Sequence, residues 1–199
     1  MTDLFEAKAA DWDANHRKSR LASAIGDTIL RRVSLNREMD VLDFGAGTGL
    51  IASRIAPEVN RIVAVDTSPA MLAQLESKSE LNGKVETVCQ DILERPLEAK
   101  FDLIVSAMAL HHVEDTDRLL ARFSEQLKDA GKVALADLDQ EDGSFHPPDT
   151  EGVFHFGFDR EELARLMRKH GFGEIDFVTA HTIAGDDKDY PVFLVTARK

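Results

Sequence analysis

A glycine-rich turn and two acidic residues form the part of the chain best suited to bind a charged ligand. The turn is Gly45-Ala46-Gly47-Thr48-Gly49, and it directly follows an apolar segment that reads as a buried strand. Glycines in that position allow a tight turn and let a ligand lie against backbone amides. Asp43 stands two residues before the first glycine, and Asp66 lies 21 positions beyond Gly45 (66 − 45). That spacing predicts a carboxylate at the ribose hydroxyls of a nucleoside ligand.

The sign of the charge beside this turn separates two classes of adenosine-containing ligand. A dinucleotide site requires Gly-x-Gly-x-x-Gly, but Leu50 occupies the position of the last glycine. The carboxylate of Asp43 would also repel a pyrophosphate, whereas it suits a ligand that carries an ammonium and a sulfonium. S-adenosylmethionine is such a ligand. The turn therefore favours S-adenosylmethionine, and a nicotinamide-dependent oxidoreductase with a degenerate loop is the weaker alternative.

Histidines supply the candidate acid–base groups. His111 and His112 follow the segment expected to be the fourth strand, and either is a weak candidate for a general base because imidazole titrates near neutral pH. The competing interpretation, which we place first, has His112 packing and His111 contacting cofactor or solvent. His146 and His155 are not spaced like metal ligands on a helix, and Cys89 is the single cysteine, so we expect no metal.

The elements that position these residues alternate along the chain. Successive strands separated by helices indicate a parallel sheet with right-handed crossovers and helices on both faces, and the last two strands should form an antiparallel hairpin. We predict an α/β, Rossmann-like, seven-stranded and mostly parallel sheet with the last strand antiparallel. The whole chain, 1–199, is expected to be one domain, with an N-terminal helical cap over 1–36 and the core over 37–199. Predicted strands cover 39–44, 61–66, 84–89, 101–106, 132–137, 174–180 and 190–197; predicted helices cover 4–13, 20–33, 50–56, 115–128 and 159–170, with another opened by Ser68-Pro69.

Four motifs together resemble those of a known family. They are Leu42-Asp43-Phe44-Gly45-Ala46-Gly47-Thr48-Gly49, Val63 to Leu72, Gln90-Asp91-Ile92, and Phe101 to Ser106. In these motifs the chain resembles the class I S-adenosylmethionine-dependent methyltransferases, especially the small type-11/12-like members, over nearly its whole length. Ala46 stands where family members often carry Cys, a change that leaves the loop geometry intact.

The resemblance implies which residues bind S-adenosylmethionine. From the residues alone, Asp91 is equally a cap of a short helical turn. The implied set is Gly45, Ala46 and Gly47 for the methionine moiety with Asp43 near its ammonium; Asp66 for the ribose hydroxyls; Thr67, Met71, Asp91 and Ile92 around the adenine; and Ser106 and Ala107 beside the sulfonium, with His111 above it.

The substrate side is less defined than the cofactor side. The segment 140–157 has the composition of a long loop, which in a compact domain is usually functional or mobile. Its aromatic residues could form a substrate wall or simply anchor the loop, and the position after the fifth strand favours the wall. Trp12 and His16 could close the N-terminal helices over the cofactor. The expected substrate-binding residues are Trp12, His16, His146, Phe154 and Phe156.

Composition restricts the class of partner. The 199 residues include 24 basic and 36 acidic side chains, a formal net charge of −12, which repels nucleic acid and anionic membranes. The N-terminal residues lack the pattern of a secretory signal, so we expect a cytoplasmic protein. Methyl transfer is an in-line displacement, so the absence of an evident catalytic dyad is expected. We therefore predict a methyltransferase acting on an unidentified small molecule, as a monomer or homodimer, with a non-catalytic S-adenosylmethionine-binding protein as the main alternative.

Overall fold

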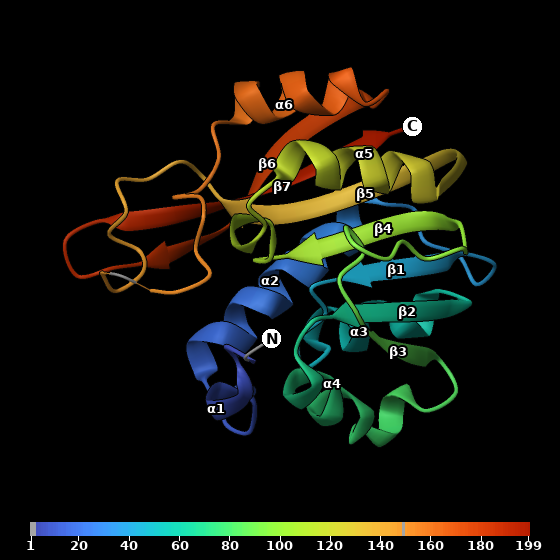
Figure 1. Cartoon of the computed structure of the whole chain (residues 1–199), viewed down its shortest axis with the longest axis horizontal. Coiled ribbons are helices and arrows are strands. Elements are labelled where there is room, and N and C mark those ends of the chain that lie inside the picture. Colours follow the sequence, from blue (N-terminus) through green and yellow to red (C-terminus); the bar gives the residue numbers. More distant parts are fainter. Residues whose placement is uncertain (1–2, 149) are drawn as a thin grey trace.

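One sheet of seven strands lies at the centre of the structure, a computed structural model that describes residues 3–148 and 150–199. Residues 1 and 2 of the predicted cap and residue 149 of the predicted loop lie outside the described residues. The spatial order of the strands is β3-β2-β1-β4-β5-β7-β6 (Figure 1). The strands are β1 (Asp40–Phe44), β2 (Arg61–Asp66), β3 (Val85–Cys89), β4 (Phe101–Ala107), β5 (Leu127–Leu138), β6 (Gly173–Ala184) and β7 (Asp189–Arg198).

The strand pairing confirms the predicted fold class. Strands β1 to β5 pair in parallel, and β7 runs antiparallel to both of its neighbours, β5 and β6. The order of the sheet reverses at β1, where β2 leaves on one side and β4 on the other. Ligands bind in such sheets outside the carboxyl ends of the strands, at the point of reversal. The glycine-rich turn directly follows β1 and so lies at that point.

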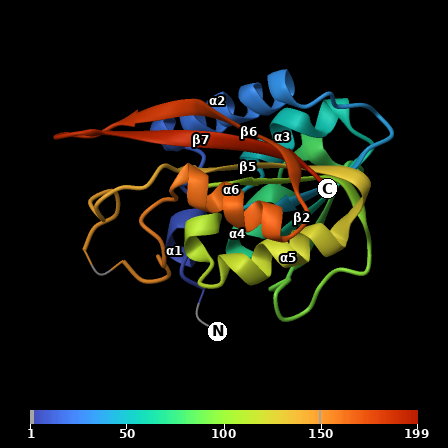
Figure 2. The same cartoon turned by 90° about the horizontal axis from the view of Figure 1, so that it is seen from above.

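Helices cover both faces of the sheet (Figure 2). Apolar residues of α2, α3 and α4 pack on one face, in a cluster that includes Ile25 and Val105. Those of α5 and α6 pack on the other face, in a cluster that includes Phe123 and Phe193. None of the helices in the described residues has the length and apolar character needed to cross a membrane. The helices are α1 (Glu6–Ala9), α2 (His16–Arg32), α3 (Leu50–Ile55), α4 (Pro69–Glu76), α5 (Thr116–Gln126) and α6 (Arg160–Lys169), with 3-10 turns η1 (Ala56–Glu58), η2 (Ser79–Leu81) and η3 (Leu110–His112).

Side-chain caps fix where the helices begin. The Ser68 hydroxyl accepts a hydrogen bond from the Met71 amide, with Pro69 at the first helical position, as predicted. The Asp159 carboxylate caps α6 through the Glu162 amide, which also agrees with the prediction. Such caps satisfy amides that the helix itself leaves free.

Several predicted boundaries were wrong. The first predicted helix, 4–13, is only the four residues of α1, and α2 begins at His16 rather than Arg20 because the side chain of Asn15 accepts two amide bonds there. Helix α5 ends at Gln126, and β5 already begins at Leu127, because Leu127 pairs with Phe101 of β4. Pairing with β7 also extends β6 to Ala184.

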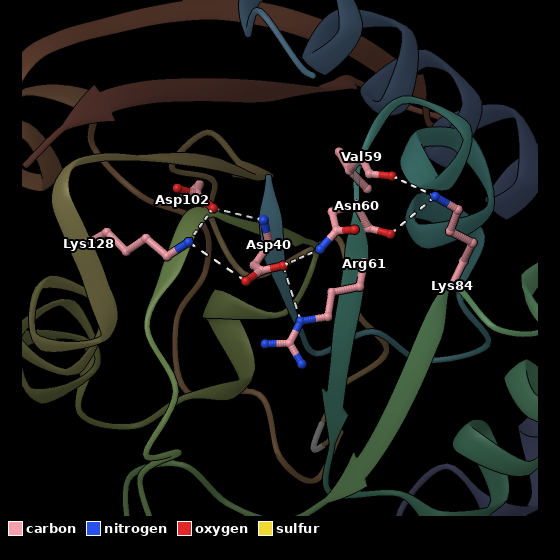
Figure 3. A network of polar contacts seen from close by, with 7 residues as sticks. All are labelled: Asp40, Val59, Asn60, Arg61, Lys84, Asp102 and Lys128. Carbon is pink, nitrogen blue, oxygen red and sulfur yellow. Dashed lines mark hydrogen bonds and ion pairs between the residues drawn. The ribbon is translucent and has the colours of Figure 1, made fainter. Parts of the chain in front are cut away.

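A polar network connects the amino ends of four strands, at the end of the sheet opposite the glycine turn (Figure 3). The Asp102 carboxylate accepts from the Asp40 amide at 2.8 Å and from Lys128 Nζ at 2.7 Å. Asp40 in turn accepts from the side chains of Asn60 and Arg61. These contacts join β1, β2, β4 and β5, which gives Asp102 a structural role.

Candidate active site

The glycine-rich turn makes its hydrogen bonds within the protein. The amides of Gly45 and Ala46 both donate to the carbonyl of Val65, at 2.9 and 3.1 Å, and the Gly47 amide donates to Asp66 Oδ2 at 2.8 Å. These three amides are therefore not free for a ligand, because the turn folds back onto the end of β2. A ligand at the turn would lie against its glycine surface and beside the acidic side chains, rather than take up these three donors.

The turn touches the segment that follows β4. A Cβ atom at Gly45, whose φ is +66°, would lie 2.4 Å from the Cβ of Ala109, so only glycine fits this contact. Gly47 has a φ of +53°, but a Cβ there would meet nothing within 4 Å. The structure thus packs one glycine against protein and leaves open space beside the other.

Asp43, beside the glycine turn, is unusual because its carboxyl group is buried. It is fully buried at the end of β1, and neither carboxylate oxygen has a hydrogen-bond partner among the residues that the structure describes. Burial, and secondarily the negative charge of Asp66, raises the pKa of Asp43 to about 8; the nearby backbone amide of Ala52 opposes the rise but does not reach hydrogen-bond geometry. A buried carboxyl without a partner is costly, and a cation beside it would restore its ionised form.

Asp66 lies at the end of β2 and contacts both the glycine turn and the cap of α4. Its Oδ1 accepts from the Ser68 amide and its Oδ2 from the Gly47 amide, each at 2.8 Å. Burial raises the pKa of this carboxyl, while these amide bonds oppose the rise. Because each carboxylate oxygen has two lone pairs, each retains one for a further donor.

The residues expected around the adenine differ in exposure. Thr67 is exposed, while Met71 is buried within the first turn of α4. Asp91 Oδ1 accepts from the Leu93 amide at 2.8 Å, so this carboxylate does cap a short turn. Ile92 is buried in the apolar layer under α5. These residues flank the carboxyl ends of β2 and β3, on the opposite side of the turn from the histidines.

Five polar side chains gather at the carboxyl ends of β4 and β5. His111 Nδ1 lies 2.7 Å from Asp137 Oδ1, and both side chains are buried. The rings of His112 and His146 lie 4.1 and 5.2 Å from the His111 ring, between centroids. Ser106, also buried here at the end of β4, has a hydroxyl without a partner, and Ala107 follows it at the half-buried strand end. Sequence reasoning placed His111 here but did not identify Asp137.

His112 and His146 are held differently from His111. His112 Nδ1 lies 2.6 Å from the Gly152 carbonyl, so this nitrogen must donate. Burial, and secondarily the charge of His111, lowers the pKa of His112 to about 4. Burial also lowers the pKa of His146, whose Nε2 is buried and has no partner in the described ranges 3–148 and 150–199.

The N-terminal segment covers the glycine turn. Asp3 Oδ2 accepts from the Ser68 hydroxyl at 2.8 Å, and Asp13 Oδ1 accepts from the Thr48 hydroxyl at 2.5 Å. Lys78 Nζ lies 2.6 Å from Asp13, which ties the segment to the end of α4 as well. Sequence reasoning missed Asp3, Asp13 and Thr48, since nothing in their spacing signals a contact across the site.

The other expected substrate residues are only partly brought together. Trp12 is half-buried in the covering segment, with Phe5 edge-on at 5.9 Å and Lys18 over its ring. His16 is exposed at the start of α2 and makes no side-chain hydrogen bond to the described site residues. Phe154 and Phe156 are 52% and 54% exposed, so their rings are not buried within the histidine cluster; the backbone of Phe154 borders it, and that of Phe156 bonds to Glu141. Within the described residues, His146 is the member of this set whose ring lies beside the His111 ring.

Comparison with known proteins agrees with this arrangement. A family model described as a methyltransferase domain matches residues 41–131. An uncharacterized methyltransferase of Geobacillus kaustophilus is 30% identical over 190 residues, covering 85% of this chain and 87% of that protein. The chain spans between 47% and 62% of the length of several other curated relatives, which are longer.

Solved structures share the fold at low identity. The matched chain in a complex of the Haloferax volcanii Trm112 methyltransferase activator with a protein described as a methyltransferase has a TM-score of 0.82 at 18% identity, covering all of this chain and 98% of that one. The N-methyltransferase NodS of Bradyrhizobium japonicum, solved with S-adenosylhomocysteine, has a TM-score of 0.74 at 17% identity, covering 99% and 94%.

Proposed function

The chain belongs to the methyltransferase family, and on that premise we propose that it is an S-adenosylmethionine-dependent enzyme that methylates a small molecule. The observation that carries the proposal is the partnerless, buried carboxyl of Asp43 beside the glycine turn. A dinucleotide would bring a pyrophosphate to this carboxyl, whereas S-adenosylmethionine brings an ammonium. The residues present therefore fit the cationic ligand better than NAD.

Each predicted cofactor residue has a role in this proposal. Asp43 would pair with the ammonium, and the methionine moiety would lie over the surface of the turn from Gly45 to Gly47. Asp66 would accept from the two ribose hydroxyls through the lone pairs that Gly47 and Ser68 leave free. Adenine would lie among Thr67, Met71, Asp91 and Ile92, and the sulfonium would face Ser106, Ala107 and His111.

The bound cofactor supplies a methyl group already activated by the positive sulfur. The protein's contribution is to hold the acceptor in line with that methyl at about 3 Å, which can lower the barrier by about 7–11 kcal/mol. The N-terminal segment would exclude water once both ligands are bound. In this proposal the hydrogen bonds that the Ser68 and Thr48 hydroxyls donate to Asp3 and Asp13 open for ligands to enter.

Calorimetric titration with S-adenosylmethionine, S-adenosylhomocysteine and NADH tests the cofactor. We expect micromolar binding of the two adenosyl ligands, at least tenfold weaker in Asp66→Asn, and no binding of NADH. Asp102→Asn is the matched control, since Asp102 is a carboxylate of the same sheet at its opposite edge (Figure 3). Binding of NADH instead, or equal affinity in wild type and Asp66→Asn, would contradict the proposal.

A further inference from the structure

His111 is fixed on three sides, which leaves a single ring nitrogen available. Its Nδ1 lies 2.7 Å from Asp137 Oδ1, and its backbone amide donates to Asp137 Oδ2 at 3.2 Å. Its carbonyl accepts from the amide of Phe154 at 2.9 Å, so the long loop holds the other side of the residue. Because a carboxylate oxygen accepts, Nδ1 carries the proton, and Nε2 presents a lone pair. In the described part of the chain Nε2 makes no hydrogen bond.

Asp137 is built into the sheet as a fixed partner for this ring. It is fully buried near the end of β5, and its Oδ1 also accepts from the Leu138 amide at 2.8 Å. Three N–H groups thus set the direction of the carboxylate. A carboxylate that orients an imidazole and stabilises its protonated form is the arrangement used by histidine general bases.

The position of the pair suits the acceptor side of the site. Ala109, two residues before His111, touches Gly45, so the turn that carries His111 borders the glycine loop. His111 therefore stands between the proposed cofactor pocket and the 140–157 loop.

We propose that His111 is the general base of methyl transfer and Asp137 its positioning residue, so that the acceptor is a small molecule with an acidic hydroxyl, a phenol or an enol. The proposal rests on the proposed function. The acceptor oxygen forms a bond to the methyl carbon while the carbon–sulfur bond breaks, and that electron pair stays on sulfur. The hydroxyl proton goes to His111 Nε2, and the imidazolium later returns it to water.

The groups around His111 favour it over its neighbours as the base. His112 donates to a neutral carbonyl, and its pKa of about 4 makes it a weak base. No carboxylate of the described residues is bonded to the ring of His146, and burial lowers the pKa of His146. The charged and titratable groups that face this cluster are Asp137 from β5, His112 from η3, His146 and Glu141 from the long loop, and Lys8 from α1.

A histidine base also restricts the acceptor to a weak acid. Imidazole takes a proton effectively only from groups whose pKa is near its own operating range, and a phenol or enol is much closer to that range than an aliphatic alcohol. The ring of Phe154 is exposed, and its backbone is bonded to His111, so in this proposal it offers an apolar surface for the flat body of such a molecule.

Nitrogen NMR of the histidine rings tests the proton positions without any acceptor. We expect His111 in wild-type protein loaded with S-adenosylhomocysteine to carry its proton on Nδ1 and none on Nε2 at about pH 8. The signal is assigned by its loss in His111→Gln. An Nε2-protonated tautomer would overturn the proposal.

Methyl transfer to defined probes tests the chemistry. Wild type is incubated with S-adenosylmethionine and 4-nitrophenol, catechol or acetylacetone, with pyridine and dimethyl sulfide as acceptors that lose no proton. We expect S-adenosylhomocysteine release with at least one hydroxyl or enol probe. Asp137→Asn should slow it about a hundredfold or more and move the acidic limb of the pH–rate profile to lower pH, with unchanged cofactor affinity.

Asp117→Asn is the matched control, because Asp117 pairs with His170 Nε2 at 2.7 Å on the surface between α5 and α6. It should leave the rate unchanged. His111→Gln gives a second slow variant should Asp137→Asn unfold, which thermal melting detects. Equal rates in wild type and both dyad variants, or transfer to the aprotic probes alone, would overturn the dyad. Failure to bind S-adenosylhomocysteine at all would instead be a failure of the proposed function.

Discussion

At the scale of single residues, Gly45 and Gly47 separate stability from ligand binding. Both have positive φ, but only Gly45 has a protein atom where a Cβ would stand. Gly45→Ala should destabilise the fold by about 2 kcal/mol or more, because it adds overlap with Ala109 to the left-handed strain. Gly47→Ala should cost only about 1 kcal/mol of the free energy of unfolding, yet weaken S-adenosylhomocysteine at least tenfold by filling the space proposed for the ligand.

Gly83→Ala is the control for Gly47→Ala. Gly83 has a φ of +76° and nothing within 4 Å of its built Cβ, but it lies before β3, away from the turn. Gly83→Ala should lose a similar amount of stability and no affinity for S-adenosylhomocysteine. Urea unfolding and calorimetry measure the two quantities, and equal affinity in Gly47→Ala and Gly83→Ala would contradict the proposed ligand position.

The same scale shows what a sequence can reveal about the site. Asp43 and Asp66 were predictable because they lie at fixed distances from the glycines along the chain. Asp137 was not, although it ends a buried apolar segment, because its contact with His111 joins residues 26 apart through the pairing of β4 and β5. An acid at the end of a core strand was the available signal.

At the scale of elements, the N-terminal segment should act as a cover that opens. Asp13 holds it through Thr48 and Lys78. Asp13→Ala removes both contacts, which are worth about 1 kcal/mol together at a partly exposed site, so amides of residues 3–14 should exchange about five- to tenfold faster. Hydrogen–deuterium exchange measured by mass spectrometry follows this segment, and S-adenosylhomocysteine should slow it in wild type.

Asp27→Ala provides the comparison, since Asp27 pairs with Arg54 between α2 and α3 and does not touch the covering segment. Exchange in residues 3–14 should be the same as in wild type. If Asp13→Ala also leaves it unchanged, the two contacts do not hold the cover closed.

The elements themselves were predicted in kind and order, while several ends were not. Hydrophobic periodicity identifies a buried strand or an amphipathic helix, but tertiary pairing decides how far each continues. β5 begins five residues earlier than predicted (132 − 127) because Leu127 pairs with Phe101 across a register shift. The four-residue α1 shows the converse, since the expected helix gives way to a turn whose side chains bond to the site.

At the scale of the whole molecule, the charge on Asp43 couples folding to pH. Its pKa rises from 3.8 to about 8 on folding. Between these values the native state holds a proton that the unfolded state lacks, so the free energy of unfolding falls as pH rises, by at most about 1.4 kcal/mol per pH unit. Asp66, whose pKa is also raised, adds a contribution of the same sign.

Asp43→Asn isolates this contribution, because the amide cannot ionise while the other groups remain. Its advantage in stability over wild type should grow from about pH 5 to about pH 8 and then level off, as measured by urea unfolding at constant ionic strength. A constant difference over that interval would show that Asp43 ionises normally in the folded protein.

The ligand should offset the cost of ionising Asp43 in the folded protein, since an ammonium beside Asp43 favours the carboxylate. Binding of S-adenosylhomocysteine near neutral pH should then release up to about one proton, seen as a dependence of the calorimetric enthalpy on the buffer, and Asp43→Asn should release none from this site.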